Sequence, residues 1–219
     1  MDGVNDCPVE VGGEALWLLA ERAVFWPRRA TLIVSDLHIG KAAAFRAAGV
    51  PVPEQTTVGT LARLSRAIER TRAERVLCLG DLLHARSGRT EAALAAVAAW
   101  RARHAALPFV LVRGNHDTHA GDPPGEWEIE CVDEPSEEDP FSFRHKPAAT
   151  EGRYTLAGHI HPAITLNGAG RQQITLPCFH FGLRLGILPA FGEFTGTAPV
   201  RREAGDRVYA VAGERVVRV

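Results

Sequence analysis

The sequence predicts an α/β fold, and two features of the chain lead to this prediction. In the first half, short apolar runs alternate with longer segments of helical periodicity, an order typical of crossover units and a largely parallel sheet. In the second half, from about residue 120, Pro and Gly punctuate short alternating segments, which favours antiparallel strands. The 219 residues suffice for one well-buried domain, so we expect a single domain over residues 1–219.

Three apolar runs in the first half predict the parallel strands. Residues 31–35 read TLIVS, and the segments RVLCLGD from residue 75 and FVLVRGNHD from residue 109 repeat this pattern. Between them we expect helices at residues 54–73 and 90–106, where apolar side chains recur at helical spacing. In the first helix this spacing assigns Val58, Leu61, Leu64 and Ile68 to the buried face and Arg63, Arg66 and Arg70 to a solvated face.

The remaining segments predict further strands and one loop. Trp17 and Trp26 flank an N-terminal segment that we expect to pair as strands in the core. In the second half, residues 141–145 and 154–161 alternate in the manner of strands. Residues 133–140, DEPSEEDP, combine acidic side chains with prolines and predict an exposed loop with a solvated face.

Composition and charge argue against several classes of protein. The formal net charge of -1 gives the whole chain no electrostatic reason to bind nucleic acid or an anionic membrane, so such affinity would have to be local. The longest uninterrupted apolar stretch, residues 92–100, is far shorter than the roughly 20 residues of a membrane-spanning helix. The N-terminus lacks the apolar region of a secretory signal, and the four cysteines form no C-x-x-C pair. We therefore expect a cytoplasmic protein with reduced thiols.

Each predicted parallel strand ends in polar side chains that can bind a metal or move a proton. Because the C-terminal ends of parallel strands share one edge of a sheet, where ligands usually bind, we expect these groups to converge. They are Asp36 and His38 after the first strand, Asp81 and His84 after the second, and Asn115 and His116 after the third.

Three more histidines extend this set. His145 ends the alternating stretch FSFR, and His159 with His161 forms the motif G-H-I-H. Both D-x-H and H-x-H place alternate side chains on one side of an extended segment, so two residues can reach one ion. A single histidine at a strand end is more often a hydrogen-bonded structural residue than a ligand. The joint occurrence of these motifs after apolar runs, flanked by Gly, favours a metal centre over a series of turns.

The ordered motifs D-x-H, G-D, G-N-H-D, H and G-H-x-H resemble those of the calcineurin-like metallophosphoesterases over residues 31–162. More narrowly, SDLHIGK, GDLLH, GNHD and AGHIHP, in a chain of this length, are similar to the bacterial ligase-associated DNA-damage-response endonucleases. The resemblance implies a four-layer αββα sandwich of two mixed β-sheets flanked by helices. It also implies a binuclear phosphodiesterase with two metal ions at the strand ends.

A ligand set for each ion follows from this resemblance. His145 is assigned in preference to His119, which falls in a Gly/Pro-rich loop. Asp81 would bridge the two ions. The first ion would be held by Asp36, His38, Asp81 and His161, and the second by Asp81, Asn115, His145 and His159.

The types of ligand indicate the metal and the chemistry. Carboxylate, amide and imidazole groups without thiolate suit Mn²⁺ or another ion of intermediate hardness, so we expect two divalent ions, with Mn²⁺ preferred. Two ions on the order of 4 Å apart can lower the pKa of a bridging water, orient the phosphate and neutralise charge on the attacking and leaving oxygens. A metal-bound hydroxide would then be the nucleophile. The neutral Asn115 would add coordination without negative charge that repels a phosphodiester.

His116 is the candidate catalytic residue. The resemblance places it over the phosphate, where it would protonate the leaving oxygen or stabilise charge on it without binding a metal. Asp117 is a candidate supporting residue, since it could bond the other ring nitrogen of His116 and fix its tautomer. An equally good interpretation of Asp117 is an acceptor that simply closes the turn.

Four other residues are candidate substrate contacts. Lys41 and Lys146, the only lysines, each directly follow a metal motif and could contact phosphate, although chance or a solvated position explains each of them as well. His84 and Arg86 lie just beyond G-D at the same sheet edge and could touch a flanking phosphate.

Three functions are compatible with these residues. The first is a DNA phosphodiesterase or endonuclease acting in repair, on single-stranded DNA or at structural irregularities, with a DNA ligase and a helicase as functional neighbours implied by the resemblance. The second is a phosphoesterase or pyrophosphatase for a small nucleotide or phosphate ester, which the near-neutral charge leaves open. The third is a non-catalytic scaffold on the same fold, which the complete ligand set disfavours.

Overall fold

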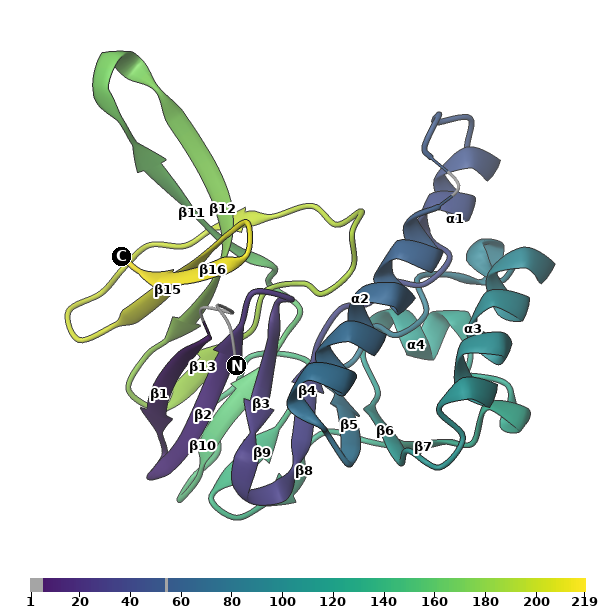
Figure 1. Ribbon diagram of the computed structural model, residues 1–219, viewed down its shortest axis with the longest axis horizontal. Coiled ribbons are helices and arrows are strands. Elements are labelled where there is room, and N and C mark those ends of the chain that lie inside the picture. The colour runs from purple at the N-terminus through teal and green to yellow at the C-terminus, as the bar shows by residue number, and fades with distance from the viewer. Residues whose placement is uncertain (1–5, 54) are drawn as a thin grey trace.

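The computed structural model describes residues 6–53 and 55–219, and it shows two β-sheets packed face to face (Figure 1). The seven strands of the first sheet lie in chain order: β1 (Cys7–Val11), β2 (Glu14–Leu19), β3 (Ala23–Trp26), β4 (Thr31–Val34), β5 (Arg75–Cys78), β6 (Phe109–Val112) and β7 (Ile129–Val132). Strands β1 to β4 are antiparallel, whereas β4 to β7 run parallel. The three predicted parallel strands are therefore confirmed as β4, β5 and β6.

The second sheet comes from the second half of the chain. Its order is β14 (Ala198–Pro199), β11 (Pro162–Asn167), β12 (Gln173–Phe181), β13 (Leu185–Ile187), β10 (Tyr154–Ala157), β9 (Phe141–Phe143) and β8 (Ser136–Glu138), and β12 also pairs with β15 (Arg207–Ala212), which pairs with β16 (Arg215–Arg218). Strands β9, β10 and β13 run parallel to one another, so the predicted antiparallel pairing holds only for part of this sheet, which is mixed as the family resemblance implies. The predicted loop at 133–140 was also wrong in part, because β8 lies within it and pairs with β9.

The α-helices all precede residue 121 among the described residues. They are α1 (Lys41–Ala47), α2 (Thr56–Thr71), α3 (Glu91–Arg103) and α4 (Asn115–Ala120), and the 3-10 turns are η1 (Pro27–Arg29), η2 (Arg86–Gly88), η3 (Gly125–Trp127) and η4 (Ala169–Arg171). The helices lie on the side of the first sheet that faces away from the second sheet (Figure 1). None of the helices in the described ranges is both long and apolar enough to cross a membrane.

Two hydrophobic cores result from these layers, because the central strands of the first sheet bury both faces. Leu32 and Val34 of β4 pack under the helices, whereas Ile33 between them packs against the second sheet. In this second core the rings of Trp26 and Phe141 contact edge to face at 5.0 Å. Strand alternation puts Trp17 on the other face of β2, where 41% of its surface is exposed, so only Trp26 has the predicted core position.

The two mixed sheets and flanking helices confirm the predicted fold class. The prediction of a second helical layer, on the outer face of the second sheet, was wrong, because the described α-helices all pack on the first sheet. The outer face of the second sheet carries hydroxyl groups, including those of Ser142 and Thr155. Thr150 covers both: its backbone N–H donates to Thr155 Oγ1 at 3.1 Å, and its hydroxyl donates to Ser142 Oγ at 2.9 Å. The loop that contains Thr150 thus covers this polar face through hydrogen bonds, where a packed helix would require apolar side chains.

The helix α2 departs from the prediction at several side chains. Val58 lies in its first turn and is 59% exposed, although Leu61, Leu64 and Ile68 are buried as predicted. Of the arginines, Arg66 is exposed, but Arg63 and Arg70 are not a solvated face. The guanidinium of Arg70 binds the carboxylates of Asp6 and Glu21, and that of Arg63 binds the carbonyl of Phe191 and the carboxylate of Glu193.

Candidate metal centre

Seven polar side chains meet where strands of both sheets end. Asp36 follows β4, Asp81 follows β5, and Asn115 begins α4 directly after β6. His145 follows β9, and His159 and His161 follow β10. Because β4, β5 and β6 are parallel, their C-terminal ends share one edge, as the sequence predicts. The structure brings together Asp36 with His38 and His161, and Asp81 with His145 and His159, each group within 4.8 Å.

The backbone at these positions is in an unfavourable conformation. Five of the seven residues have left-handed φ angles: Asp36 (56°), His38 (48°), Asp81 (54°), His159 (70°) and His161 (52°). Such angles cost of order 1–3 kcal/mol each for residues other than Gly, and they persist only where surrounding contacts impose them. One such contact is the hydrogen bond from the His38 N–H to the Asp81 carbonyl at 2.9 Å, which ties two motifs together. Strain concentrated in this way is characteristic of a functional site.

The first group is built around Asp36. Its Oδ1 lies 3.2 Å from His161 Nε2 and 4.0 Å from His38 Nε2, and the two imidazole nitrogens are 3.2 Å apart. The other carboxylate oxygen accepts hydrogen bonds from the Ser35 hydroxyl and the His159 N–H. His161 Nδ1–H donates to the Gly196 carbonyl at 2.9 Å, which leaves the Nε2 lone pair directed at Asp36.

The second group is built around His145. Its Nδ1–H donates to the Leu79 carbonyl at 2.9 Å, so its Nε2 carries a lone pair. This Nε2 lies 3.0 Å from Asn115 Oδ1, 3.0 Å from His159 Nδ1 and 3.4 Å from Asp81 Oδ1. The carboxylate of Asp81 thus lies between the two groups, with its Oδ2 3.9 Å from His38 Nε2.

The donor set fits divalent cations. Asp36 Oδ1 is the one buried side-chain oxygen or nitrogen in the described part of the chain that lacks a hydrogen-bond partner. It faces the Nε2 atoms of His38 and His161, and His145 Nε2 likewise faces carboxylate and amide oxygens. Electron pairs directed at one another in a buried site repel unless a cation or proton lies between them. The carboxylate, amide and imidazole donors of these clusters can accommodate divalent metal ions.

Burial also determines protonation in the metal-free chain. It raises the pKa of Asp81 to about 8, with the charge of Asp36 as the next largest cause. Burial lowers the pKa of His38 to about 2 and lowers that of His145. The imidazoles of His38 and His145 are therefore neutral at pH 7, as metal ligands must be.

Asp117 connects two of the motifs through the backbone. Its carboxylate accepts the N–H groups of Asp81 at 2.7 Å, Gly114 at 2.9 Å and Leu83 at 3.1 Å. The prediction that it might hold the His116 ring was wrong, because the carbonyl of His84 occupies that position. The alternative, an acceptor that closes the turn, is correct and extends to the neighbouring loop.

Glycines in the motifs allow this close packing. A Cβ at Gly114 would lie 2.2 Å from Asp81 Oδ1, and a Cβ at Gly80 would lie 2.3 Å from His145 Nδ1. Both contacts are shorter than any ordinary van der Waals distance. The glycines of G-N-H-D and G-D are therefore required because side chains of the metal centre lie directly against them.

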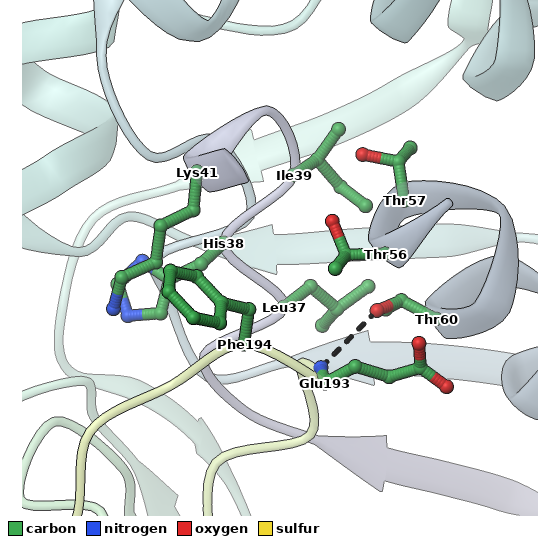
Figure 2. Close-up of a pocket in the computed structure, with 9 residues that line it drawn as sticks. All are labelled: Leu37, His38, Ile39, Lys41, Thr56, Thr57, Thr60, Glu193 and Phe194. Carbon is green, nitrogen blue, oxygen red and sulfur yellow. Dashed lines mark hydrogen bonds between the residues drawn. The ribbon is translucent and has the colours of Figure 1, made fainter. Parts of the chain in front are cut away.

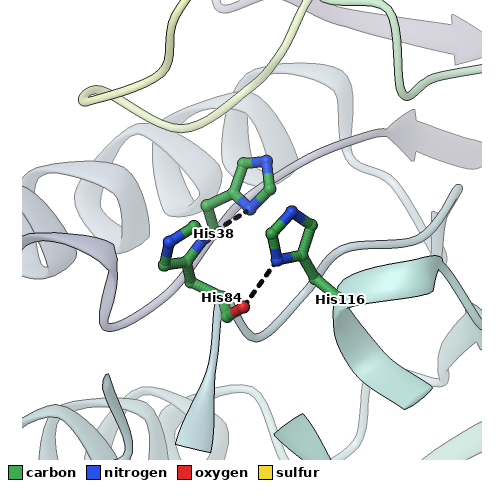
Figure 3. A group of neighbouring side chains, drawn as sticks. All are labelled: His38, His84 and His116. Carbon is green, nitrogen blue, oxygen red and sulfur yellow. Dashed lines mark hydrogen bonds between the residues drawn. The ribbon is translucent and has the colours of Figure 1, made fainter. Parts of the chain in front are cut away.

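His116 and His84 lie together beside this centre (Figure 3). His116 Nδ1–H donates to the His84 carbonyl at 2.7 Å, and the two rings stack at 4.7 Å. His116 Nε2 lies 3.9 Å from Asp81 Oδ2. With His38, these residues form a third group of close imidazoles, in which His84 Nδ1 lies 3.3 Å from His38 Nδ1. This third group lacks a carboxylate and shares His38 with the first.

Of the other three predicted substrate contacts, only Lys41 lies at the border of the metal centre. Lys41 lines a small crevice with His38, Phe194 and the threonines of α2, so it borders the centre (Figure 2). Lys146 is exposed, and its backbone N–H donates to Glu134. Arg86 is exposed, and its Nε–H donates to the carbonyl of His119 at 3.1 Å.

Two residues that hydrogen-bond to candidate metal ligands were not predicted from the sequence. Glu134 accepts the His145 N–H at 2.8 Å, but it lies in the acidic stretch that was assigned to a solvated loop. Ser35 donates to Asp36 and could have been found, because it directly precedes Asp36 in the motif SDLH. Only a long-range contact reveals Glu134, so no local pattern could have identified it.

Comparison with known proteins extends this description. A family model described as "Calcineurin-like phosphoesterase" matches residues 30–202. Among solved structures, the nuclease MPE of Pseudomonas putida is 45% identical, with 98% of this chain and 100% of that chain covered and a TM-score of 0.86. Yfce, a phosphoesterase from E. coli, is 13% identical, with 86% and 97% covered and a TM-score of 0.44. A search of curated proteins found no match.

Proposed function

Because the chain belongs to the calcineurin-like phosphoesterase family, we propose that it is a metal-dependent nuclease that hydrolyses phosphodiester bonds in DNA. The similarity to the Pseudomonas putida nuclease, at 45% identity over nearly the full length of both chains, supports nucleic acid rather than a small ester as the substrate. The single observation that carries the catalytic part of the proposal is the convergence of carboxylate, amide and imidazole groups around Asp81.

We assign two ions to the two groups. The first would be held by Asp36, His38, Asp81 and His161, and the second by Asp81, Asn115, His145 and His159. The orphaned Oδ1 of Asp36 and the central place of the Asp81 carboxylate support this division. The absence of thiolate from the set favours Mn²⁺ over a structural zinc ion. Bound there, the ions would activate water and neutralise charge on the phosphate.

The chain's own residues then complete the reaction. His116 would hold a proton at Nε2 and transfer it to the leaving oxygen, because its Nδ1 is committed to the His84 carbonyl. His84, stacked on His116, would keep that ring in place. Asn115 would coordinate without adding charge, and Lys41, at the border of the centre, would bind a phosphate oxygen. We assign no substrate contact to Arg86, and Lys146 would reach at most a distant phosphate.

The biological setting belongs to the proposal as well. The motifs SDLHIGK, GDLLH and AGHIHP support a role in DNA repair in the cytoplasm, on single-stranded DNA, beside a ligase and a helicase. We treat residues 1–219 as one functional domain, since ligands come from both sheets.

Cleavage assays test the proposal directly. Pure protein is incubated with Mn²⁺, Mg²⁺ or chelator on linear single-stranded, linear duplex and circular single-stranded DNA. The proposal predicts metal-dependent cutting of the circle, which only an endonuclease can achieve, and no cutting with chelator. Hydrolysis of mononucleotide esters with Mn²⁺, but never of polynucleotide, would replace DNA with a small phosphate ester as the substrate.

A further inference from the structure

Two phenylalanines lie beside the metal centre and take no part in it. Phe45 is half-buried on α1, and Phe194 lies in the segment between β13 and β14 with 38% of its surface exposed. Their rings contact edge to face, with centroids 5.5 Å apart. Phe194 also lines the crevice that contains His38 and Lys41 (Figure 2). The exposed part of the Phe194 ring therefore lies at the border of the metal centre.

These rings continue an aromatic row that starts at the proposed proton donor. His116 stacks on His84 at 4.7 Å, and the His84 ring lies 6.1 Å from that of Phe45. Phe45 in turn contacts Phe194. The row therefore leads without interruption from the place where the leaving oxygen is protonated to the exposed face of Phe194.

The metal centre itself fixes the position of Phe194. On one side, the Gly192 N–H donates to the carbonyl of Asp36 at 3.1 Å. On the other side, the Gly196 carbonyl accepts from His161 Nδ1–H at 2.9 Å. Between them, the carboxylate of Glu193 pairs with Arg63 at 3.0 Å. The backbone on both sides of Phe194 is thus hydrogen-bonded to candidate ligands, which keeps this residue beside the metal centre.

We propose that the ring of Phe194, supported edge to face by Phe45, is a stacking platform for an unpaired nucleobase next to the phosphate that is cleaved. Aromatic faces stack on any base, so the platform provides affinity without sequence preference. The net charge of -1 allows little general attraction to the phosphate backbone, which increases the relative weight of stacking. Bases of an intact duplex are already stacked and cannot reach the platform, so it selects single-stranded or distorted DNA. This inference rests on the proposed nuclease function and identifies the form of its substrate.

Steady-state kinetics with Mn²⁺ on three substrates test the platform. The substrates are a thymidine oligonucleotide, an oligonucleotide of the same length made of abasic sites, and methyl p-nitrophenyl phosphate as a small diester. The proteins are the wild type, Phe194→Ala, Phe45→Ala and Phe194→Tyr, which keeps an aromatic face. Leu183→Ala is the matched control, because Leu183 is 93% exposed in the turn before β13, at the end of the sheet away from the metal centre.

For Phe194→Ala we expect KM on the thymidine oligonucleotide to rise by about 5- to 150-fold, the range for loss of one stacked base. KM on the abasic oligonucleotide should stay unchanged, Phe45→Ala should show a smaller effect of the same kind, and Phe194→Tyr should resemble the wild type. An equal change on both oligonucleotides, or no change on either, would overturn the platform while leaving the nuclease proposal intact. Wild-type hydrolysis of the small diester without cleavage of either oligonucleotide would instead reject the nuclease proposal, and the platform with it.

Discussion

The Nδ1–H of His116 donates a hydrogen bond to the main-chain carbonyl of His84 at 2.7 Å. A carbonyl can only accept, so Nδ1 keeps its proton whether the imidazole is neutral or charged. Every proton that His116 takes up or releases must therefore use Nε2, the nitrogen that faces Asp81 Oδ2 at 3.9 Å. The loop that supplies Asp81 thus also orients the proposed acid.

Removing the His116 imidazole should separate catalysis from metal binding. We expect His116→Ala to keep both metal ions, since His116 belongs to neither assigned ligand set, and to lose about 10²- to 10⁴-fold in kcat, the usual contribution of a general acid. Metal content by mass spectrometry and kcat on DNA check this. His119→Ala is the control, because His119 is an exposed histidine on the same helix α4 and should have nearly normal kcat. Loss of a metal ion from His116→Ala would contradict the role assigned here.

Metal affinity should depend on pH through Asp81. Burial raises its pKa to about 8 in the metal-free chain, whereas His38 and His145, with lowered pKa values, hold no proton at neutral pH. A metal ion must therefore displace one proton below pH 8, and the apparent Kd should fall by up to about tenfold per pH unit from pH 6 to 8 and then level off. Calorimetry in buffers of different ionisation enthalpy measures this proton release. A constant Kd over that range would refute the assignment, and Asp81→Asn should bind neither ion.

Gly114→Ala should disable the centre without unfolding the chain. The backbone angle φ of -96° suits alanine, but the new Cβ would lie 2.2 Å from Asp81 Oδ1 and must displace that carboxylate. We expect metal binding and cleavage to be lost while the far-UV circular dichroism spectrum stays native. Gly125→Ala is the matched control, because its Cβ would meet nothing within 4 Å. Normal metal content in Gly114→Ala would show that Asp81 has more freedom than the structure indicates.

Asp117→Ala should lower the thermal stability of the chain, although Asp117 is not an assigned metal ligand. The change leaves the N–H groups of Asp81, Leu83 and Gly114 buried without an acceptor, at about 1–3 kcal/mol each, so Tm should fall by at least about 5 °C. Thermal unfolding with chelator present measures this effect apart from metal binding. Asp122→Ala, which removes an exposed partner of Arg113, should change Tm little. An unchanged Tm in Asp117→Ala would contradict the structural role of the carboxylate.

The parallel strands and the convergence of polar groups were predictable because both depend on local patterns. Apolar runs that end in Asp, Asn and His define β4, β5 and β6, and parallel strand ends must share an edge. The ligand roles themselves rest on the family's motifs, and measurements of metal content in the variants test them.

Features that depend on distant contacts were not predictable. Arg70 looks solvated on a helical wheel, yet Asp6 and Glu21, both far away in sequence, bind its guanidinium. Trp17 looks like a core residue, but the register of β2 turns it outward. The acceptor for His116 is a backbone carbonyl, which leaves no mark in the side-chain sequence, so the sequence left the role of Asp117 open between this acceptor and closure of the turn.

Diffraction from crystals grown with Mn²⁺, recorded on both sides of the manganese absorption edge, tests the two-metal centre by locating the ions themselves. We expect two anomalous peaks about 3.5–4 Å apart, on either side of the Asp81 carboxylate. One peak would contact Asp36, His38 and His161, and the other Asn115, His145 and His159. A single peak among His38, His84 and His116, the group without a carboxylate, would contradict the two-metal centre and the role of His116 as the proton donor.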